Sequence, residues 1–354
     1  MKIAVLLPSL SRSATITVAF NIADGLVSAG HEVDILYFDD LVERPAPIGC
    51  AVFKVNFFDK IDFSKYDVLH SHNLRPDLYV AVNRKRIKCV CVSTVHNYVK
   101  EELENYHGKL ASFFVTRLWL WAWRKQDRVV CLTRDAANYY KKLLPGSTVE
   151  FVYNGVALAD VSLMQLDAKV VNAAALLKQN NLFVLGTYCN QTKGKGLDQI
   201  VRLVHRSKEL GAVIIGSGPE TESLMSLAKE LDVELRCIFI PFTVYAYAYN
   251  QYFDAYIIPS RREGFGISLV EAALSDAVLI CSDIPVFREM FDGSEVAFFK
   301  LDDIEGLLTI IDEIRAGTNQ QGLAKKKAKE IFSINAMVGK YLEIYTQALK
   351  RLDN

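Results

Sequence analysis

The chain lacks several features that would assign it to a specialised class of protein. Its 354 residues carry no net charge, because 41 acidic residues balance 41 basic ones, so the broad positive field that nucleic-acid binding requires is absent. No apolar run reaches the roughly 18–20 residues that cross a bilayer. The first residues read as a strand and its loop, and not as a secretory signal. We therefore expect a cytoplasmic protein without a nucleic-acid partner.

Cysteine pairs at metal-binding or redox spacing are also missing. The 7 cysteines are an odd number, none of them forms a CxxC motif, and most lie in apolar runs. Cys89 and Cys91 point to one face of an expected strand, which is too sparse for a zinc site. We predict buried free thiols in a reducing compartment, without disulfides and without a bound metal.

The composition is that of an ordinary globular protein, with 51% hydrophobic and 23% charged residues. At about 150 residues per domain, the length favours two domains. Short apolar runs alternate with amphipathic segments, which is typical of parallel sheets with helices on both faces. We therefore predict an α/β fold of two doubly wound, Rossmann-like domains facing a cleft. The expected strands are Lys2–Pro8, His31–Phe38, Asp67–Leu69, Lys88–Val95, Arg128–Leu132 and Val149–Tyr153, followed by Leu182–Tyr188, Ala212–Ile215, Arg236–Ile240, Ala255–Ile258, Ala277–Cys281 and Val296–Phe299.

The two series of strands are separated by Asn154–Asn181, which opens with an Asn-Gly turn and has no strand character. We place the connection between the domains there, with residues 1–160 in the first domain and 161–334 in the second. The final segment carries apolar residues at helical spacing from Met337 to Ala348, which predicts a C-terminal helix over 335–354.

Histidines follow two of the expected strands, His70 and His72 the third and His96 the fourth. In open α/β sheets, ligands bind beyond the carboxyl ends of the strands, where loops and helix N-termini offer free N–H groups. This placement makes His96 a candidate catalytic residue, while a structural role remains open. No carboxylate or cysteine joins the histidines at ligand spacing, so we expect no metal site.

Glycines and lysines follow the first strand of the second domain. Gly186 is expected to end that strand, and the run Lys193–Gly196 (KGKG) precedes the next helix. Glycines let the backbone approach an anion, a helix N-terminus favours negative charge and Lys supplies a point charge, so this loop is a candidate diphosphate site. A solvated Lys-Gly turn is the alternative. Gly216 and Gly218, after the next strand, fit either a binding loop or a tight turn.

The strongest signal is the segment SRREGFGISLVEAAL. Glu263 precedes the glycine-rich Gly264–Gly266 and a helix, and Glu271 lies inside that helix among apolar residues. A buried carboxylate is costly unless it is paired or bound to a ligand. We infer that the helix N-terminus takes phosphate while the carboxylates accept hydrogen bonds from sugar hydroxyls. Two exposed glutamates on a helix are the alternative.

These motifs resemble the EGFG…E signature of retaining GT-B glycosyltransferases of family four, the glycosyl transferases group 1, which include the phosphatidylinositol mannosyltransferase and glycogen synthase type. The resemblance covers nearly the whole chain. The segments PSLSRSATITVAFNIADGL, DVLHSHN, STVHN, FVYNGV, KGLDQIV, IIGSGPE and SDIPVFRE resemble family segments in the same order.

The resemblance implies an enzyme that moves a sugar from a nucleotide-sugar donor, by family frequency a UDP-linked hexose. It implies a glycan or lipid-linked acceptor, in bacterial surface polysaccharide or lipopolysaccharide biosynthesis, and neither a cofactor nor a metal. It also implies that the C-terminal helix packs back on the first domain.

The resemblance further implies roles for single residues. Glu263 would bond donor-sugar hydroxyls, Glu271 would hold the nucleotide ribose, and Lys195 would neutralise the departing diphosphate. His96 would lie beside the donor sugar, on the side of the first domain. The other residues implied in donor binding are Gly264, Phe265, Gly266, Lys193, Gly186, Gly216 and Gly218, and those of the acceptor loop are Ser11, Arg12, Ser13 and Ala14.

Two places depart from the family pattern. Thr187 stands where the family usually has an Arg, so one phosphate contact would be missing unless Lys193 supplies it. Ser13 and Ala14 stand where the family has paired glycines, so we expect a loop that is shaped for a different acceptor or that binds the donor less closely.

Glycoside hydrolysis by the usual route needs two carboxyls that face each other across the bond. Glu263 and Glu271 lie on one side of a helix start, which suits the holding of a ligand better than it suits hydrolysis. We therefore predict a retaining, front-face substitution in which the leaving phosphate deprotonates the acceptor hydroxyl.

Aromatic and basic residues gather in Phe113–Arg124, and Arg84–Lys88 adds a second basic cluster. Such residues can lie on an anionic membrane surface, so we predict peripheral contact with a membrane, a buried helix being the alternative.

Two other functions fit the same motifs. A GT-B sugar-nucleotide epimerase would bind the donor without needing an acceptor loop. A non-catalytic nucleotide-sugar-binding protein is compatible with Thr187 and with the missing glycines. An NAD-dependent dehydrogenase is disfavoured, because SLSRSAT and not GxGxxG follows the first strand.

Overall fold

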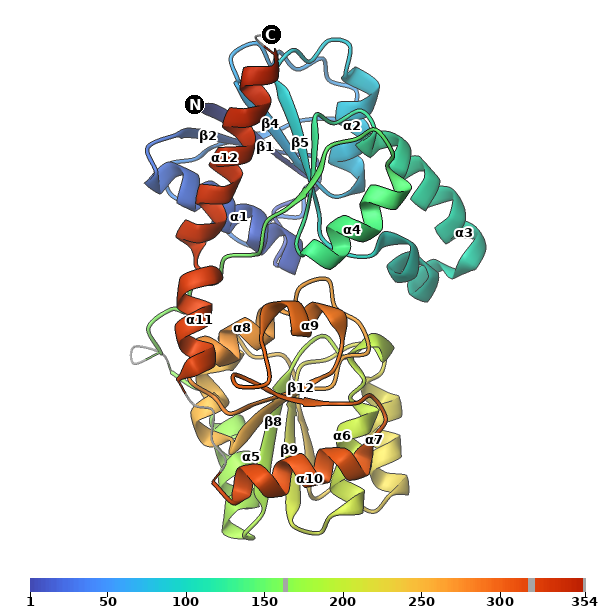
Figure 1. The fold of residues 1–354 in the computed structure, drawn as a ribbon, viewed down its shortest axis with the longest axis vertical. Helices are drawn as coiled ribbons and strands as arrows, with labels where there is room; N and C mark the ends of the chain where they lie inside the picture. Colours follow the sequence, from blue (N-terminus) through green and yellow to red (C-terminus); the bar gives the residue numbers. More distant parts are fainter. Residues whose placement is uncertain (162–164, 318–321, 353–354) are drawn as a thin grey trace. The chain divides into compact units, whose positions relative to one another are not determined.

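The computed structural model describes residues 1–161, 165–317 and 322–352, which form two compact units (Figure 1). Unit 1 comprises Met1–Val156 together with Phe332–Asn354, and unit 2 comprises Ala157–Ile331. The expected division after residue 160 lies a few residues beyond this one. Within the described residues, no helix is long and apolar enough to span a membrane.

The connection between the domains was expected within Asn154–Asn181, and the boundary between the two units falls there, at Val156 and Ala157. Helix α5 (Ala168–Gln179) occupies that stretch and packs on the sheet of unit 2, where Val170 and Leu177 are buried. The carboxylate of Asp167 caps the helix by accepting the N–H of Lys169 at 2.9 Å. The segment is rich in alanine, which favours a helix, so its lack of strand character did not mean a lack of structure.

Unit 1 contains a seven-stranded sheet in the order β3-β2-β1-β4-β5-β6-β7, with parallel pairing throughout. One strand was missed in the sequence. The exposed residues of β3 (Ala51–Lys54) form the sheet edge, so the strand has no buried apolar run to reveal it. The other strands are β1 (Lys2–Leu7), β2 (Glu32–Tyr37), β4 (Val68–His72), β5 (Val90–Val95), β6 (Arg128–Cys131) and β7 (Val149–Phe151).

The C-terminal helix α12 (Ile334–Leu352) belongs to unit 1, where it packs on α1 (Ala14–Ser28) and contacts β5 (Figure 1). A glycine makes this close approach possible, because a Cβ at Gly25 would lie 2.4 Å from Cγ2 of Val338. Residues 353 and 354 of the expected helix lie outside the described residues. The other helices of this unit are α2 (Leu74–Asn83), α3 (Val99–Trp123) and α4 (Arg134–Leu143).

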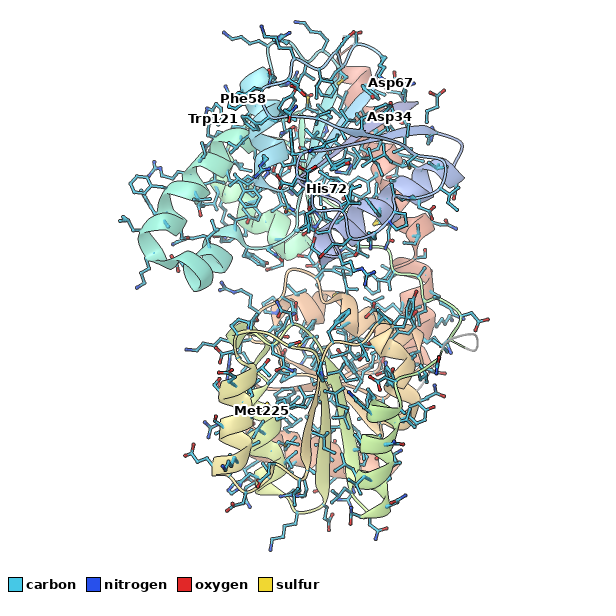
Figure 2. All side chains as sticks on the ribbon, turned by 180° about the vertical axis from the view of Figure 1, so that it is seen from behind. Asp34, Phe58, Asp67, His72, Trp121 and Met225 are labelled. Atoms are coloured by element: carbon cyan, nitrogen blue, oxygen red, sulfur yellow. The ribbon has the colours of Figure 1, made fainter. Side chains whose placement is uncertain are left out.

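A buried carboxylate anchors α3 to the sheet of unit 1. Asp77 of α2 accepts hydrogen bonds from the indole N–H of Trp119 at 2.7 Å and of Trp123 at 2.9 Å. It also accepts the hydroxyl of Ser71, at 2.6 Å. Burial raises the pKa of Asp77 to about 6, although these donors oppose the shift. Two of the three tryptophans of the predicted membrane segment are therefore bonded inside the unit, and Trp121 is partly exposed on α3 (Figure 2).

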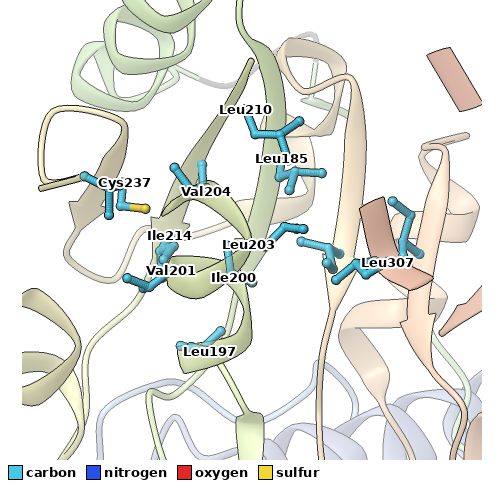
Figure 3. Close-up of a cluster of buried hydrophobic side chains, with 14 of the residues drawn as sticks. Leu185, Leu197, Ile200, Val201, Leu203, Val204, Leu210, Ile214, Cys237 and Leu307 are labelled. Carbon is cyan, nitrogen blue, oxygen red and sulfur yellow. The ribbon is translucent and has the colours of Figure 1, made fainter. Parts of the chain in front are cut away.

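Unit 2 contains a six-stranded parallel sheet in the order β10-β9-β8-β11-β12-β13. Figure 3 shows its core, where Leu185 and Ile214 of the sheet pack with Ile200 and Leu307 of the covering helices. The strands are β8 (Phe183–Tyr188), β9 (Leu210–Ile215), β10 (Cys237–Ile240), β11 (Ala255–Ile258), β12 (Leu279–Ser282) and β13 (Ala297–Phe299). The remaining helices are α6 (Asp198–Arg206), α7 (Thr221–Glu230), α8 (Ile267–Leu274), α9 (Pro285–Met290), α10 (Ile304–Arg315) and α11 (Leu323–Ile331), with short 3-10 turns η2 (Lys193–Lys195) and η3 (Ala246–Tyr252).

The cysteines confirm the predicted thiol state. All seven are free, and only Cys50 and Cys189 are less than fully buried. Burial raises the pKa of Cys50 to about 11 and that of Cys189 to about 12, so both stay protonated at neutral pH.

Replacing Asp77 by Ala should lower the free energy of unfolding by about 3 kcal/mol, because Ser71, Trp119 and Trp123 each lose a hydrogen bond to a buried carboxylate. Urea unfolding followed by tryptophan fluorescence measures the loss. Asp24→Ala removes an exposed carboxylate on α1 of the same unit and is the control, with an expected change within about 0.5 kcal/mol. Equal effects of the two substitutions would show that Asp77 does not anchor α3.

Candidate functional site

An ion pair lies where two neighbouring strands of unit 2 end. Nζ of Lys195, in η2 after β8, is 2.6 Å from Oε1 of Glu263, in the loop after β11. The same oxygen accepts the hydroxyl of Ser260 at 2.7 Å. The Glu263 side chain is 8% exposed and that of Lys195 is 26% exposed, so the lysine is the member of the pair that remains open to solvent.

Gln199 fixes the two loops that carry this pair. Its amide Nε2 donates to the carbonyl oxygens of Gly196, at 3.2 Å, and of Pro259, at 2.9 Å. Gly196 has a φ of +62°, and a Cβ there would lie 2.3 Å from the Pro259 oxygen. The close approach of the loops therefore requires glycine at this position.

Helix α8 begins directly after the glutamate loop. Gly266 is its N-cap, with a φ of +92° that favours glycine, and a Cβ there would lie 2.7 Å from the ring of Phe287. The first N–H groups of a helix have no acceptor inside it, and the first turn of α8 contains no acidic residue. The helix therefore offers its positive end to an anion beside Lys195 and Glu263.

Glu271 lies further along α8 and is half-buried. Burial raises its pKa to about 7. Two buried tyrosines, Tyr188 and Tyr256, lie near enough for the charge of Glu271 to raise their pKa values further. The carboxylate is thus poorly hydrated, which is the condition that the sequence pattern predicted for it.

The remaining glycines of the predicted donor site support close packing of the loops. Gly186 lies inside β8 and does not end it, so that expectation is wrong; a Cβ there would lie 1.8 Å from the ring of Phe253. Gly216 has a φ of +124°, and a Cβ would lie 2.0 Å from the carbonyl oxygen of Cys189. A Cβ at Gly218 would lie 2.5 Å from the carbonyl oxygen of Gln191, so the loop after β9 lies directly on the loop after β8.

The other donor-site residues have different surroundings. Lys193 is exposed in η2, two positions before Lys195, and Phe265 is buried in the glycine-rich loop. Gly264 lies beside Phe265 in the same loop. Thr187 is buried inside β8, where it leaves no charged group in place of the usual Arg.

Three histidines form a chain at the carboxyl ends of β4 and β5 in unit 1. Nδ1 of His72 lies 3.0 Å from Nε2 of His96, and the rings of His70 and His72 are 4.3 Å apart. His70 bonds the hydroxyls of Tyr345 and Thr94, each at 2.7 Å. Burial lowers the pKa of His96 to about 3, so this candidate catalytic residue is neutral.

The predicted acceptor loop precedes α1 in unit 1. Ser13 caps the helix, because its hydroxyl accepts the N–H of Ile16 at 3.4 Å, and Ala14 is the first helical residue. The hydroxyl of Ser11 donates to that of Ser13 at 3.2 Å. The backbone N–H of Arg12 donates to Oε2 of Glu43 at 2.8 Å. Ser13 is thus the N-cap of α1, and Arg12 is exposed.

Sequence reasoning missed several residues beside these sites. Ser260 orients Glu263, and its position at a strand end was a usable signal. His72 was noticed but not selected. Arg44, which donates to Thr17 Oγ1 at 3.1 Å, lies near Arg12, and burial together with this neighbouring charge lowers the pKa of Arg44. Nothing in the sequence pattern marks it, because it follows no expected strand directly.

In the part of the chain that is described, no group of three or more His, Cys, Asp and Glu side chains could hold a metal ion. Unit 2 offers two kinds of group near the carboxyl ends of β8 and β11. Lys195 and the start of α8 can stabilise a diphosphate, and Glu263 and Glu271 can accept hydrogen bonds from hydroxyls.

Two family models match the chain. The family model described as glycosyl transferases group 1 matches residues 172–352, just over half of the chain. A second model, described as glycosyltransferase family 4, matches residues 16–160.

Individual relatives span the chain. The O-antigen biosynthesis glycosyltransferase WclY of Escherichia coli is 29% identical over 365 residues, covering 99% of this chain and 100% of that protein. A phosphatidyl-myo-inositol mannosyltransferase of Mycolicibacterium smegmatis is 26% identical over 330 residues, covering 84% of this chain and 81% of that protein.

The structure of Anabaena HepE in complex with UDP-glucose has a TM-score of 0.75 at 16% identity, covering 98% of this chain and 100% of that one. This likeness and the two helix-flanked parallel sheets confirm the predicted GT-B architecture of two Rossmann-like domains. The chain therefore belongs to the glycosyl transferases group 1 family and is a glycosyltransferase.

Proposed function

We propose that this glycosyltransferase moves a hexose, with retention of configuration, from a UDP-sugar to a glycan or lipid-linked acceptor in O-antigen or lipopolysaccharide biosynthesis. The observation that carries the proposal is the Lys195–Glu263 pair beside the start of α8. The UDP-glucose complex of HepE supports the donor class. The names of WclY and of the phosphatidyl-myo-inositol mannosyltransferase support the acceptor class.

Unit 2 would bind the charged diphosphate of the donor and also its uncharged sugar and ribose. Lys195 and the N–H groups of Phe265 and Gly266 would bond the diphosphate, with Lys193 supplying the charge that Thr187 does not. Glu263 would accept sugar hydroxyls, and Glu271 would accept those of the ribose. Lys195 and Glu263 neutralise each other, so neither member of this pair is an uncompensated charge.

The reaction would be a front-face substitution. The bond between the anomeric carbon and the leaving phosphate oxygen breaks, and a bond forms from that carbon to the acceptor oxygen on the same face. The acceptor proton passes to the departing phosphate. Lys195 and the α8 N-terminus stabilise the charge that develops on this phosphate, so no metal is required.

Unit 1 would supply the acceptor side of the reaction. The loop Ser11, Arg12, Ser13 and Ala14 would contact the acceptor, and the positive charges of Arg12 and Arg44 favour an acceptor with an anionic group. His96 would contact the donor sugar. Because its imidazole is neutral, it would not repel the positive charge that develops on the sugar ring.

The first test removes the side chain of Glu263 or that of Lys195. Glu263→Ala and Lys195→Ala should each lower the rate of sugar transfer by about 100-fold or more, because each removes an interaction that strengthens in the transition state. The measurement is radiolabelled sugar transfer to a membrane extract or a synthetic lipid-linked glycan. Lys340→Ala and Glu343→Ala, which break an exposed pair of the same type on α12, are the controls with unchanged rates.

Full transfer activity in either site variant would contradict the assignment. Product analysis also separates the alternatives. An epimerised sugar nucleotide formed from donor alone would indicate an epimerase, and binding without turnover would indicate a non-catalytic protein. An inverted anomeric configuration of the product would contradict retention.

Glu271 carries a test based on pH. An ionised carboxylate accepts ribose hydroxyls better than a protonated one, and its pKa is about 7. Between pH 6 and pH 8 the ionised form rises, so affinity for UDP-glucose should increase by roughly tenfold and then level off. UDP-glucose suits this calorimetric titration because its diphosphate stays fully ionised over the range. Glu271→Gln should bind more weakly and without this slope; an unchanged slope would contradict the role.

We also propose that α3 rests on an anionic membrane surface. Beyond the kink at Gly108, its exposed side chains include Leu110, Phe113, Phe114 and Leu118. The exposed side chains of Lys85, Arg86 and Lys88 add positive charge. Arg84 does not contribute freely, because it pairs with Asp127 at 2.8 Å and donates to the carbonyl oxygen of Ile87.

Binding to vesicles that contain phosphatidylglycerol tests this surface. Leu110→Ala with Phe114→Ala should reduce co-sedimentation several-fold, since both remove exposed apolar area. Leu235→Ala removes a similarly exposed apolar side chain of unit 2 and is the control. Absence of binding by the unsubstituted protein would remove the proposal.

A further inference from the structure

His72 is buried at the carboxyl end of β4 and has one hydrogen-bond partner. Its Nδ1 lies 3.0 Å from Nε2 of His96, and its Nε2 is buried with no partner among the described residues. Figure 2 shows His72 inside unit 1. A fully buried imidazole with one free nitrogen restricts which tautomer the pair can adopt.

Only one of the two nitrogens that meet can carry the proton. If His96 donated, His72 would hold its own proton on Nε2, as an N–H without an acceptor in a buried position. Orphaned buried N–H groups are rare, because they lose their hydration and gain no bond. If His72 donates from Nδ1, only a lone pair is left unpaired, which costs less.

We propose that His72 is a positioning residue that donates Nδ1–H to Nε2 of His96 and so places the proton of His96 on Nδ1. This inference rests on the proposed role of His96 at the donor sugar. In this tautomer, the nitrogen of His96 that is not used by His72 is an N–H donor. It can bond a sugar hydroxyl oxygen and cannot act as a base.

The ring of His72 is itself held in place. The ring of His70 stacks on it at 4.3 Å, and Nδ1 and Nε2 of His70 each bond a hydroxyl, from Tyr345 and Thr94 respectively. The hydroxyl of Thr94 also bonds that of Tyr341, at 2.9 Å. Helix α12 therefore supports the orientation of His72, and His72 in turn that of His96.

The protonation states of the three histidines are consistent with this arrangement. Burial lowers the pKa of His70 and that of His96 to about 3 each, and it lowers the pKa of His72 well below its usual value. All three imidazoles are neutral at pH 7, so His72 donates without repelling its neighbours. No other titratable group among the described residues bonds His72 or His96.

The tautomer can be read directly from ¹⁵N shifts of the ring nitrogens in protein labelled at histidine. The chain has only 6 histidines, and the loss of signals in His96→Ala identifies those of His96. In the free protein at pH 7, His96 should carry its proton on Nδ1, and its Nε2 should show the shift of an unprotonated ring nitrogen. A protonated Nε2 on His96 would overturn the proposal.

Substitutions of His72 test whether it is the cause. His72→Asn keeps an amide N–H near the position of Nδ1, whereas His72→Leu removes the donor. In His72→Leu, the proton of His96 should move at least partly to Nε2, and kcat should fall about tenfold or more with little change in the KM for acceptor. His72→Asn should restore the Nδ1–H pattern and part of kcat. An unchanged His96 tautomer in His72→Leu would overturn the proposal.

Two features keep this test separate from the proposed function. The spectra need no substrate, so a protein that transfers no sugar would still report the His96 tautomer. If His72→Leu does not fold, the spectrum of the unsubstituted protein alone decides. A confirmed tautomer with full transfer in His96→Ala would contradict the role of His96 and leave the hydrogen bond established.

Discussion

The ion pair between Lys195 and Glu263 is the interaction on which the candidate site depends. Two charges that are largely out of water persist only when their geometry is good and their other bonding groups are satisfied. Ser260 supplies the extra hydrogen bond to the carboxylate, and Gln199 holds the two loops together. Lys195 and Glu263 are thus held in a fixed arrangement at the end of the loop that leads into α8.

Burial controls the titratable groups of both units, with opposite effects on acids and bases. It raises the pKa of Asp77 and of Glu271, and it lowers that of His72 and His96, because the charged form is disfavoured in each case. The carboxylate of Asp77 anchors a helix, and both of its oxygens accept hydrogen bonds. Glu271 is only half-buried on α8, which makes it accessible to hydroxyl groups of a ligand.

The glycines show how far a sequence pattern can be read. The GFG segment was expected at a helix start, and Gly266 is the N-cap of α8 with a left-handed backbone. Gly186 was expected at a strand end, yet it lies inside β8 against the ring of Phe253. A glycine that is needed for phosphate and one that is needed for a neighbouring ring look alike in sequence, because the neighbour comes from a distant segment.

The sequence by itself determined the alternation of strands and helices, the glutamate and lysine motifs and the family, since these depend on local spacing and residue type. It did not determine the exposed strand β3, which has no apolar pattern, or the helical state of Ala168–Gln179. Only the tertiary structure decided that Lys195 meets Glu263, that two tryptophans bond Asp77, and that His72 bonds His96. Each of these contacts joins residues far apart in the chain. The pairing of parallel strands brings together Lys195 with Glu263 and His72 with His96, and the packing of α2 on α3 brings together Asp77 and the tryptophans, which no local pattern specifies.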